Sequence, residues 1–325
     1  MSRLSSPHLR IARIDHWPKN AIVPLGALVA VLVDPAANSG SLPPLALAFL
    51  GACLVSSSNY TLNELLDAAS DRQHPVKRSR AAASGDVAPA AALIQWAALG
   101  AAGLLLGAAA HPHVALALSA FWAAAVVYNV PPIRTKDVPH LDLLTESLNN
   151  PLRLLIGWFA VVHARFPPLS LLMAVWMGGA FFMAAKRFAE YRQIGDPAVA
   201  ARYRRSFAWY TEERLLLEMF FHGVAAALFA GVFIVRWRLE LILGIPLAAA
   251  LFTWYLRLAL RRGAGANPDH LYRDPGFLAF AAASLLVFVV LMFVHVPDLY
   301  ELFNVEPARS VPLWTVGGPA AEGGP

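Results

Sequence analysis

The sequence predicts an all-α integral membrane protein with about nine transmembrane helices. Of the 325 residues, 58% are hydrophobic and only 14% are charged, and the mean hydropathy is +0.53. Soluble domains carry about 25% charged residues, so this composition excludes an ordinary soluble domain. The apolar residues also form long runs, and one helical bilayer span requires about 20 of them in succession.

The apolar runs place the nine expected spans along the chain. They cover roughly residues 20–35, 44–66, 89–110, 113–130, 141–162, 168–187, 214–235, 238–258 and 276–296. The first is short and contains Pro24, so we expect it to tilt or to pack inside the protein. The eighth contains Gly244 and Pro246, which predict a kink. Residues 1–297 thus form one predicted transmembrane domain, and the Pro-, Gly- and Ala-rich residues 298–325 form a predicted disordered tail.

The positively charged residues of the loops predict the orientation of these spans. With the N-terminus in the cytoplasm, most of the 26 Lys and Arg residues fall in cytoplasmic loops and few fall in outer loops. Because membrane proteins show this bias in short loops, the sequence predicts a multi-pass protein of the cell (inner) membrane with a cytoplasmic N-terminus. The same loops account for a pI near 9.6, and we expect no nucleic-acid partner.

The most informative polar stretch ends the second span. Asn63, Asp67 and Asp71 recur at every fourth residue, so on a helix they lie along one side. One amide and two carboxylates are hard oxygen ligands that suit Mg²⁺, which usually keeps waters and shares its shell with substrate phosphates. The sequence therefore predicts a Mg²⁺ site formed by these three residues.

A basic loop follows this predicted metal site directly. It contains Arg72, Lys77, Arg78 and Arg80. Lysine and arginine side chains at this position are suited to hold the phosphates of a metal-bound substrate. A carboxylate stripe beside a basic loop at a membrane surface indicates chemistry on a phosphorylated lipid.

Two further polar stretches fall on the predicted cytoplasmic side. Span six ends in Lys186-Arg187-Phe-Ala-Glu190, and span four ends in Tyr128-Asn-Val-Pro-Pro-Ile-Arg134-Thr-Lys136. Lys186 and Glu190 are spaced to form an i,i+4 ion pair, so substrate contact and a structural pair are both open for them. Tyr128 fits either a substrate site or an interfacial aromatic belt.

Span five carries a polar face within the membrane. Its members are Asp142, Glu146, Asn149, Asn150 and Arg153. Charges at membrane depth are costly and usually face a cavity or a partner. Arg153 is therefore a candidate substrate-binding residue, and the alternative is a structural contact with Glu146 or Asn149.

At this point the residues resemble a known family. Asn63-x3-Asp67-x3-Asp71, followed by Lys77, Arg80 and Gly85, resembles the first aspartate-rich signature of UbiA-superfamily intramembrane prenyltransferases. The Tyr128-x-x-Pro-Pro-x-Arg134-x-Lys136 segment is similar to the one that closes span four in many members. The resemblance covers roughly residues 10–295, and it implies nine helices around a central cavity that opens to lipid.

Within the superfamily, the chain resembles the decaprenyl-phosphate phosphoribosyltransferase branch most. Three stretches carry this: His16-Trp17-x-Lys19-Asn20, Asp71-x-x-His74-Pro75-x-Lys77-x-x-Arg80 and Lys186-Arg187-x-x-Glu190. Typical prenyltransferases have an aspartate-rich second motif at the last of these. The chain departs from the branch in Glu64, where Asp is usual, in Ala81, where Pro is usual, and over residues 137–153.

The resemblance implies a role for each candidate residue. Mg²⁺ held by Asn63, Asp67 and Asp71 would bind the pyrophosphate of a donor, and cations would neutralise the charge on the departing pyrophosphate. The implied catalytic residues are Asp67, Asp71, Lys77 and Lys186. The implied substrate-binding residues are Lys19, Asn20, Arg80, Tyr128, Arg134, Lys136, Arg153, Arg187 and Glu190.

Three functions stay open on the sequence. The first is phosphoribosyl transfer from phosphoribosyl pyrophosphate to a polyprenyl phosphate, and the single acidic residue beside Lys186 and Arg187 favours it. The second is transfer of an isoprenyl group from a prenyl diphosphate to an aromatic or other lipid acceptor. The third is lipid transport or binding without chemistry, but charges gathered at one membrane face favour an enzyme over a transporter.

Overall fold

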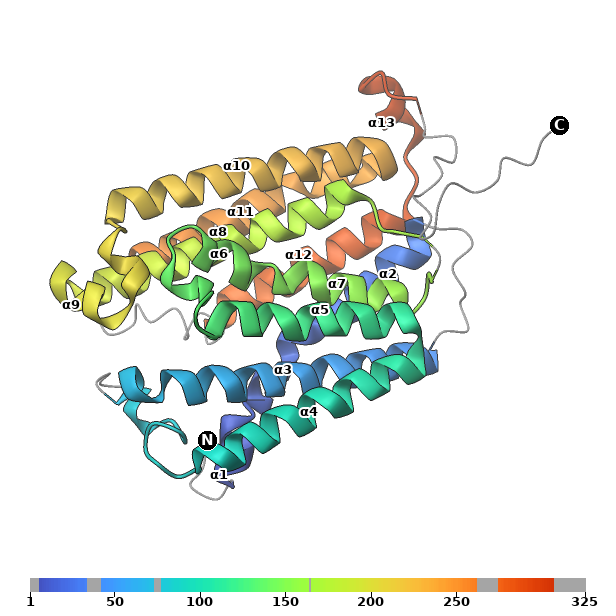
Figure 1. Ribbon diagram of the computed structural model, residues 1–325. Helices are drawn as coiled ribbons and strands as arrows, with labels where there is room; N and C mark the ends of the chain where they lie inside the picture. Colours follow the sequence, from blue (N-terminus) through green and yellow to red (C-terminus); the bar gives the residue numbers. More distant parts are fainter. Residues whose placement is uncertain (1–5, 34–41, 73–76, 164, 262–273, 307–325) are drawn as a thin grey trace. The chain divides into compact units, whose positions relative to one another are not determined.

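The computed structural model describes residues 6–33, 42–72, 77–163, 165–261 and 274–306 (Figure 1). These residues are helical with connecting turns, and no strand forms among them. The chain divides into two compact units, an N-terminal unit of residues 1–165 and a C-terminal unit of residues 166–325. The all-helical class predicted from the sequence is confirmed.

The N-terminal unit holds seven of the α-helices in the described ranges and three short 3-10 helices (η). They are α1 (Pro7–Ile11), η1 (Ile14–Ala21), α2 (Ile22–Val33), α3 (Leu42–Asp71), η2 (Lys77–Ser79), α4 (Pro89–Ala110), α5 (Pro112–Asn129), η3 (Thr135–Asp137), α6 (Leu141–Ser147) and α7 (Asn149–Phe159). In this unit α3 runs beside α4 and α5, and α2 packs on α7.

The C-terminal unit is also a set of packed helices. It contains α8 (Leu169–Ile194), α9 (Pro197–Tyr203), η4 (Arg205–Ala208), α10 (Glu212–Trp237), η5 (Leu239–Gly244), α11 (Ile245–Leu260), α12 (Pro275–Phe293) and α13 (Pro297–Leu302). Here α8 packs along α10 and also contacts α11, and α12 packs on η5 and α11.

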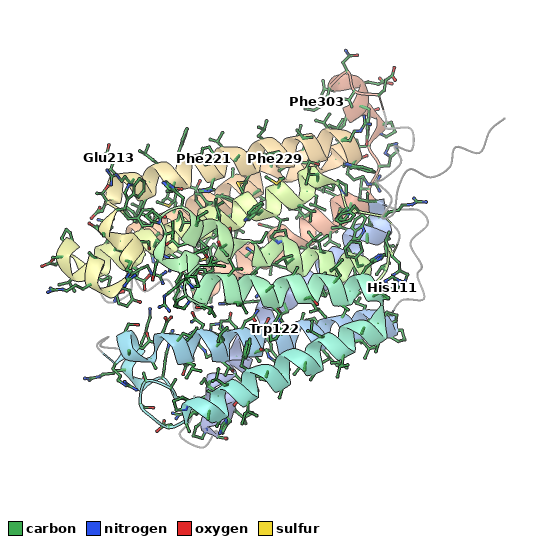
Figure 2. All side chains as sticks on the ribbon, viewed as in Figure 1. His111, Trp122, Glu213, Phe221, Phe229 and Phe303 are labelled. Atoms are coloured by element: carbon green, nitrogen blue, oxygen red, sulfur yellow. The ribbon has the colours of Figure 1, made fainter. Side chains whose placement is uncertain are left out.

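In the described residues, 8 helical segments are long and apolar enough to cross a bilayer. Seven of the expected spans match one of them, and the first matches the segment Pro7–Val33, where α1, η1 and α2 follow one another. Many apolar side chains point outward; on α10, for example, Phe221 is 65% exposed (Figure 2). Such a surface suits contact with lipid chains, and the chain is a multi-pass membrane protein.

The expected span at 141–162 is not one continuous helix. It is divided into α6 and α7, with Leu148 between them. Pro151 is the physical cause, because a proline has no N–H to donate to the carbonyl of Ser147 one turn earlier. The helical bonds resume when Leu152 donates to the carbonyl of Leu148 at 3.2 Å.

The eighth span, where the sequence predicts a kink, changes helix type along its length. The segment begins as the 3-10 helix η5, which ends at Gly244. The α-helix α11 begins at Ile245, and Pro246 is its second residue. The first residues of the predicted tail include α13, and residues 307–325 lie outside the described ranges.

Glycines set the closest helix contacts of the N-terminal unit. A Cβ built on Gly157 of α7 would lie 1.8 Å from the backbone oxygen of Val23 on α2, and one on Gly26 would lie 2.3 Å from the oxygen of Leu154. Backbones approach this closely in membrane proteins only where a small residue leaves room. The contact fixes η1, which leads into α2, beside the first turns of α7.

Candidate active site

The predicted metal stripe lies where the sequence placed it, on the last turns of α3. Asn63, Asp67 and Asp71 are all helical, and Asp71 is the final residue of the helix. Asp71 is buried, whereas the side chain of Asp67 is 20% exposed. The i, i+4, i+8 spacing puts the three oxygen-bearing side chains on one side of this helix.

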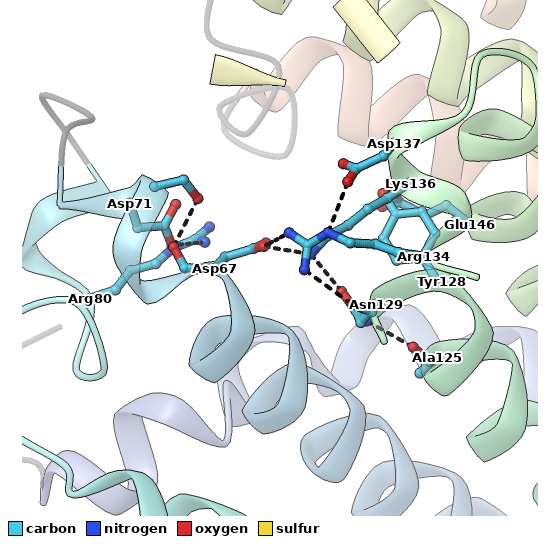
Figure 3. A network of polar contacts seen from close by, with 11 residues as sticks. Asp67, Asp71, Arg80, Ala125, Tyr128, Asn129, Arg134, Lys136, Asp137 and Glu146 are labelled. Carbon is cyan, nitrogen blue, oxygen red and sulfur yellow. Dashed lines mark hydrogen bonds and ion pairs between the residues drawn. The ribbon is translucent and has the colours of Figure 1, made fainter. Parts of the chain in front are cut away.

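Two cations from the segment after α5 contact Asp67 (Figure 3). Arg134 Nη2 lies 3.2 Å from Asp67 Oδ1, and Lys136 Nζ donates to the same oxygen. Lys136 is buried and also donates to Asn129 Oδ1 at 2.9 Å, while Arg134 Nε donates to Asp137 at 3.1 Å. The structure thus brings together residues that are 67 and 69 positions apart.

The local sequence explains how Arg134 and Lys136 reach α3. Pro131 and Pro132 follow the end of α5 at Asn129, where their missing N–H groups cannot continue the helix. The chain then turns into η3, and Arg134 takes a left-handed backbone conformation with φ of 29°. Such a conformation in a non-glycine residue costs on the order of 1–3 kcal/mol and is typical of functional sites.

Two carboxylates of α3 accept hydrogen bonds from the basic loop that follows this helix. Arg80 Nη1 donates to Asp71 Oδ2 at 2.8 Å, so a predicted phosphate ligand and a predicted metal ligand are paired. Glu64 is buried and accepts the backbone N–H of Ala82 at 3.3 Å. Glu64 and Ala81, two of the departures from the family pattern, therefore both lie where this loop packs against α3. Lys77 begins η2, whereas His74 and Pro75 lie outside the described residues.

Three members of the site were not predicted from the sequence. Asn129 accepts a hydrogen bond from Lys136, and Asp137 accepts one from Arg134. Glu146 accepts a hydrogen bond of 2.7 Å from the hydroxyl of Tyr128. Each of the three lies within or next to one of the polar stretches named in the sequence analysis. Their partners became visible only when α5, η3 and α6 were placed together.

The N-terminal unit also contains the candidates Lys19, Asn20 and Arg153, of which Asn20 and Arg153 are in contact. Arg153 Nε donates to Asn20 Oδ1 at 2.8 Å, and its Nη1 is 3.4 Å from Asn150 Oδ1. Lys19 Nζ lies 3.0 Å from His16 Nδ1. The alternative that the sequence left open, a structural contact with Glu146 or Asn149, is not the one seen: in the described residues Arg153 contacts Asn20 and Asn150.

The remaining candidates belong to the C-terminal unit. Lys186, Arg187 and Glu190 lie on the last turns of α8. Arg187 is buried and pairs with Glu190 at 3.3 Å, and the hydroxyl of Tyr203 on α9 donates to Glu190 at 2.8 Å. Burial and the neighbouring charge of Glu190 raise the pKa of Tyr203 well above its usual range.

Replacing Tyr203 with phenylalanine tests this contact through its pH dependence. A phenol whose pKa is raised by folding stabilises the protein fully below its unfolded pKa of about 10 and loses that contribution as pH rises above it. We expect Tyr203→Phe to be less stable by about 1 kcal/mol near pH 8, and the difference to shrink above pH 10. Thermal unfolding of both proteins from pH 7 to 11 measures this; a difference that does not change with pH would contradict it.

The oxygen ligands of α3 fit a hard cation. No group of three or more His, Cys, Asp or Glu side chains converges on a metal position within the residues that the structure describes. Asp67 and Asp71 with the amide of Asn63 supply at most three protein ligands, so an ion here must take the others from water or from a ligand. Mg²⁺ behaves in this way, with one or two carboxylates, several waters and substrate phosphates.

Comparison with known proteins shows the family of the chain. A model of the UbiA prenyltransferase family matches residues 23–281. The chain belongs to the UbiA prenyltransferase family. Members of this family are transferases, and this chain is one of them.

Two relatives of this UbiA-family chain and one solved structure are informative. It is 30% identical over 68% of its length to nodulation protein NoeC of Azorhizobium caulinodans, covering 69% of that protein. It is also 30% identical over 65% of its length to decaprenyl-phosphate phosphoribosyltransferase of Mycolicibacterium smegmatis, covering 65% of that enzyme. The fold resembles that of a UbiA homolog from Archaeoglobus fulgidus bound to GPP and Mg²⁺, with TM-score 0.67, 20% identity and coverage of 89% of this chain and 100% of the other.

Proposed function

We propose that this protein is a Mg²⁺-dependent intramembrane transferase that moves a phosphoribosyl group from phosphoribosyl pyrophosphate to a polyprenyl phosphate. The observation that carries the proposal is the contact between the carboxylates of α3 and three cations. Asp67 faces Arg134 and Lys136, and Asp71 faces Arg80. A site that alternates carboxylates and cations can hold a metal ion and the diphosphate bound to it.

In the proposed reaction an oxygen of the lipid phosphate forms a bond to C1 of the ribose. The bond between C1 and the pyrophosphate oxygen breaks, and pyrophosphate leaves with the electron pair of that bond. Mg²⁺ held by Asn63, Asp67 and Asp71 would act as a Lewis acid on the leaving group. Arg80, Arg134 and Lys136 lie where they can offset the negative charge that builds on it.

The number of cations favours this donor. Phosphoribosyl pyrophosphate carries one more phosphate than a prenyl diphosphate does, and the acceptor lipid brings another. We assign Lys77 on the basic loop to these additional phosphates. Substrate contact by Lys186 and Arg187, which lie on α8 in the C-terminal unit, stays a prediction. The similarity to a protein named decaprenyl-phosphate phosphoribosyltransferase supports the same assignment.

The basic loops support a placement in the cell (inner) membrane with the active site on the cytoplasmic side. The segments that carry Lys77, Arg80, Arg134 and Lys136 follow the ends of α3 and α5. Positive residues concentrate on the cytoplasmic side of such proteins. A water-soluble phosphorylated donor would meet the lipid acceptor at this surface.

Prenyl transfer is the second candidate. It is supported by the family description and by the fold neighbour that binds GPP and Mg²⁺. In that reaction the same α3 carboxylates would hold the diphosphate of an isoprenyl donor, and an apolar cavity would exclude water from the allylic cation.

An assay with two donors separates these functions. Purified protein is given radiolabelled phosphoribosyl pyrophosphate with polyprenyl phosphate and, separately, radiolabelled prenyl diphosphate with bacterial lipid extract, each with and without Mg²⁺. We expect Mg²⁺-dependent transfer of label into lipid in the first reaction. Label that enters lipid only in the second would exclude phosphoribosyl transfer.

A further inference from the structure

Arg153 is a buried cation with neutral partners. It is 8% exposed, and in the described part of the chain its hydrogen bonds go to the side-chain oxygens of Asn20 and Asn150. Its guanidinium carbon lies 4.8 Å from the centre of the Phe121 ring. Amide oxygens and an aromatic face orient a guanidinium but do not neutralise its charge.

The orientation of Arg153 is fixed by a second layer of contacts. Asn20 is fully buried, and its side chain also accepts from Ser56 at 3.1 Å and donates to Cys53 Sγ at 3.3 Å. The glycine-mediated contact between α2 and α7 keeps Asn20 and Arg153 adjacent. A buried charge without a counter-charge is energetically costly. Because Arg153 is nevertheless held in place by these hydrogen bonds, we expect an anionic ligand to bind it.

The depth of Arg153 separates it from the predicted metal site. Phe121, which it overlies, accepts a hydrogen bond through its carbonyl from Asn59 of α3. The two turns of α3 from Asn59 to Asp67 correspond to about 12 Å. An offset of this size along α3 leaves room for the ribose between a pyrophosphate at Asp67 and Asp71 and a phosphate at Arg153.

We propose that Arg153 binds the phosphate of the polyprenyl phosphate acceptor, with Asn20 and Asn150 as positioning residues. This assignment rests on the proposed function and gives each of its two anionic substrates a separate site in the N-terminal unit. The donor pyrophosphate lies at Asp67 and Asp71, and the lipid phosphate lies deeper, where its isoprenoid chain continues into apolar surroundings.

Direct binding of lipid tests the assignment without donor or metal. The full-length protein in nanodiscs is titrated with radiolabelled polyprenyl phosphate, with polyprenol of the same length, and with inorganic phosphate as competitor. We expect the protein to prefer polyprenyl phosphate over polyprenol by about 10- to 100-fold, as a charge-assisted contact gives. Inorganic phosphate at the same concentration should not compete, because it has no chain.

Four variants define the residue responsible. Arg153→Gln should remove the preference and leave polyprenol binding unchanged, and Arg153→Lys should retain part of it. Asn20→Asp keeps the guanidinium but places a carboxylate against it, so it should also lose the preference, and it tests the proposal even if Arg153→Gln does not fold. Arg236→Gln removes an exposed charge on α10 and should behave as wild type.

Each other outcome overturns the assignment. A wild type that binds both lipids equally has no phosphate site of this kind, and a preference that survives both Arg153→Gln and Asn20→Asp lies elsewhere. Competition by inorganic phosphate would identify a site for free phosphate instead of lipid. Failure of phosphoribosyl transfer in the donor assay is a separate result, since this titration contains no donor.

Discussion

Replacing Asp67 or Asp71 with asparagine is expected to lower turnover at least about 100-fold while the protein still folds. Asparagine keeps an oxygen in nearly the same place but carries no charge, so it binds a divalent cation much more weakly. The fold should survive because Lys136, which Asp67 contacts, keeps its hydrogen bond to Asn129. The measurement is the initial rate as a function of Mg²⁺ concentration, with thermal unfolding as the test of folding.

Asp86→Asn is the matched control for these two variants. Asp86 lies in the same loop region and pairs with Arg10, but both side chains are solvent-accessible, at 40% and 32%. Hydrogen bonds from Ser84 and Arg10 lower the pKa of Asp86, so it is charged in wild type, as a metal ligand would be. Its variant should retain wild-type turnover. Full activity in both Asp67→Asn and Asp71→Asn would contradict the metal assignment.

Gly157→Val should prevent the N-terminal unit from folding normally. A Cβ at this position would lie 1.8 Å from the oxygen and 2.7 Å from the carbon of the Val23 carbonyl. A backbone atom cannot move aside as a flexible side chain can, so α2 and α7 must separate, and overpacking of this kind costs about 1–3 kcal/mol or more. Separation would also withdraw Asn20 from Arg153.

The yield of monodisperse protein in detergent and its unfolding temperature measure this effect. Gly231→Val on α10 is the control, because a Cβ there meets no heavy atom within 4 Å in the described structure. We expect the control to purify like wild type and Gly157→Val to aggregate or to unfold at a clearly lower temperature. Equal unfolding temperatures would show that the two helices are not packed through Gly157.

Most of the helices could be predicted from the sequence because the bilayer imposes a length. A span requires about 20 apolar residues whatever its neighbours are, so α3, α4, α8, α10 and α12 were located from hydrophobic runs alone. The stripe of Asn63, Asp67 and Asp71 was predictable for a similar reason, since helix geometry relates residues four positions apart.

The sequence-based predictions fail where contacts between different helices determine the structure. The helix expected over 141–162 divides at Leu148, three residues before Pro151. A contact of Arg153 with Glu146 or Asn149 was one of two alternatives, but its partners are Asn150 and Asn20, the latter 133 residues away. No local pattern encodes which distant side chain a buried guanidinium meets.

The sequence by itself therefore determined the membrane class, the family and the carboxylate stripe, all of which depend on composition or on spacing within one helix. Tertiary structure alone decided that Arg134 and Lys136 reach Asp67, that Tyr203 meets Glu190, and that Arg153 contacts Asn20. The physical reason is that these contacts join different elements. Their partners are selected by helix packing, which at Gly157 and Gly26 depends on close approach of two backbones.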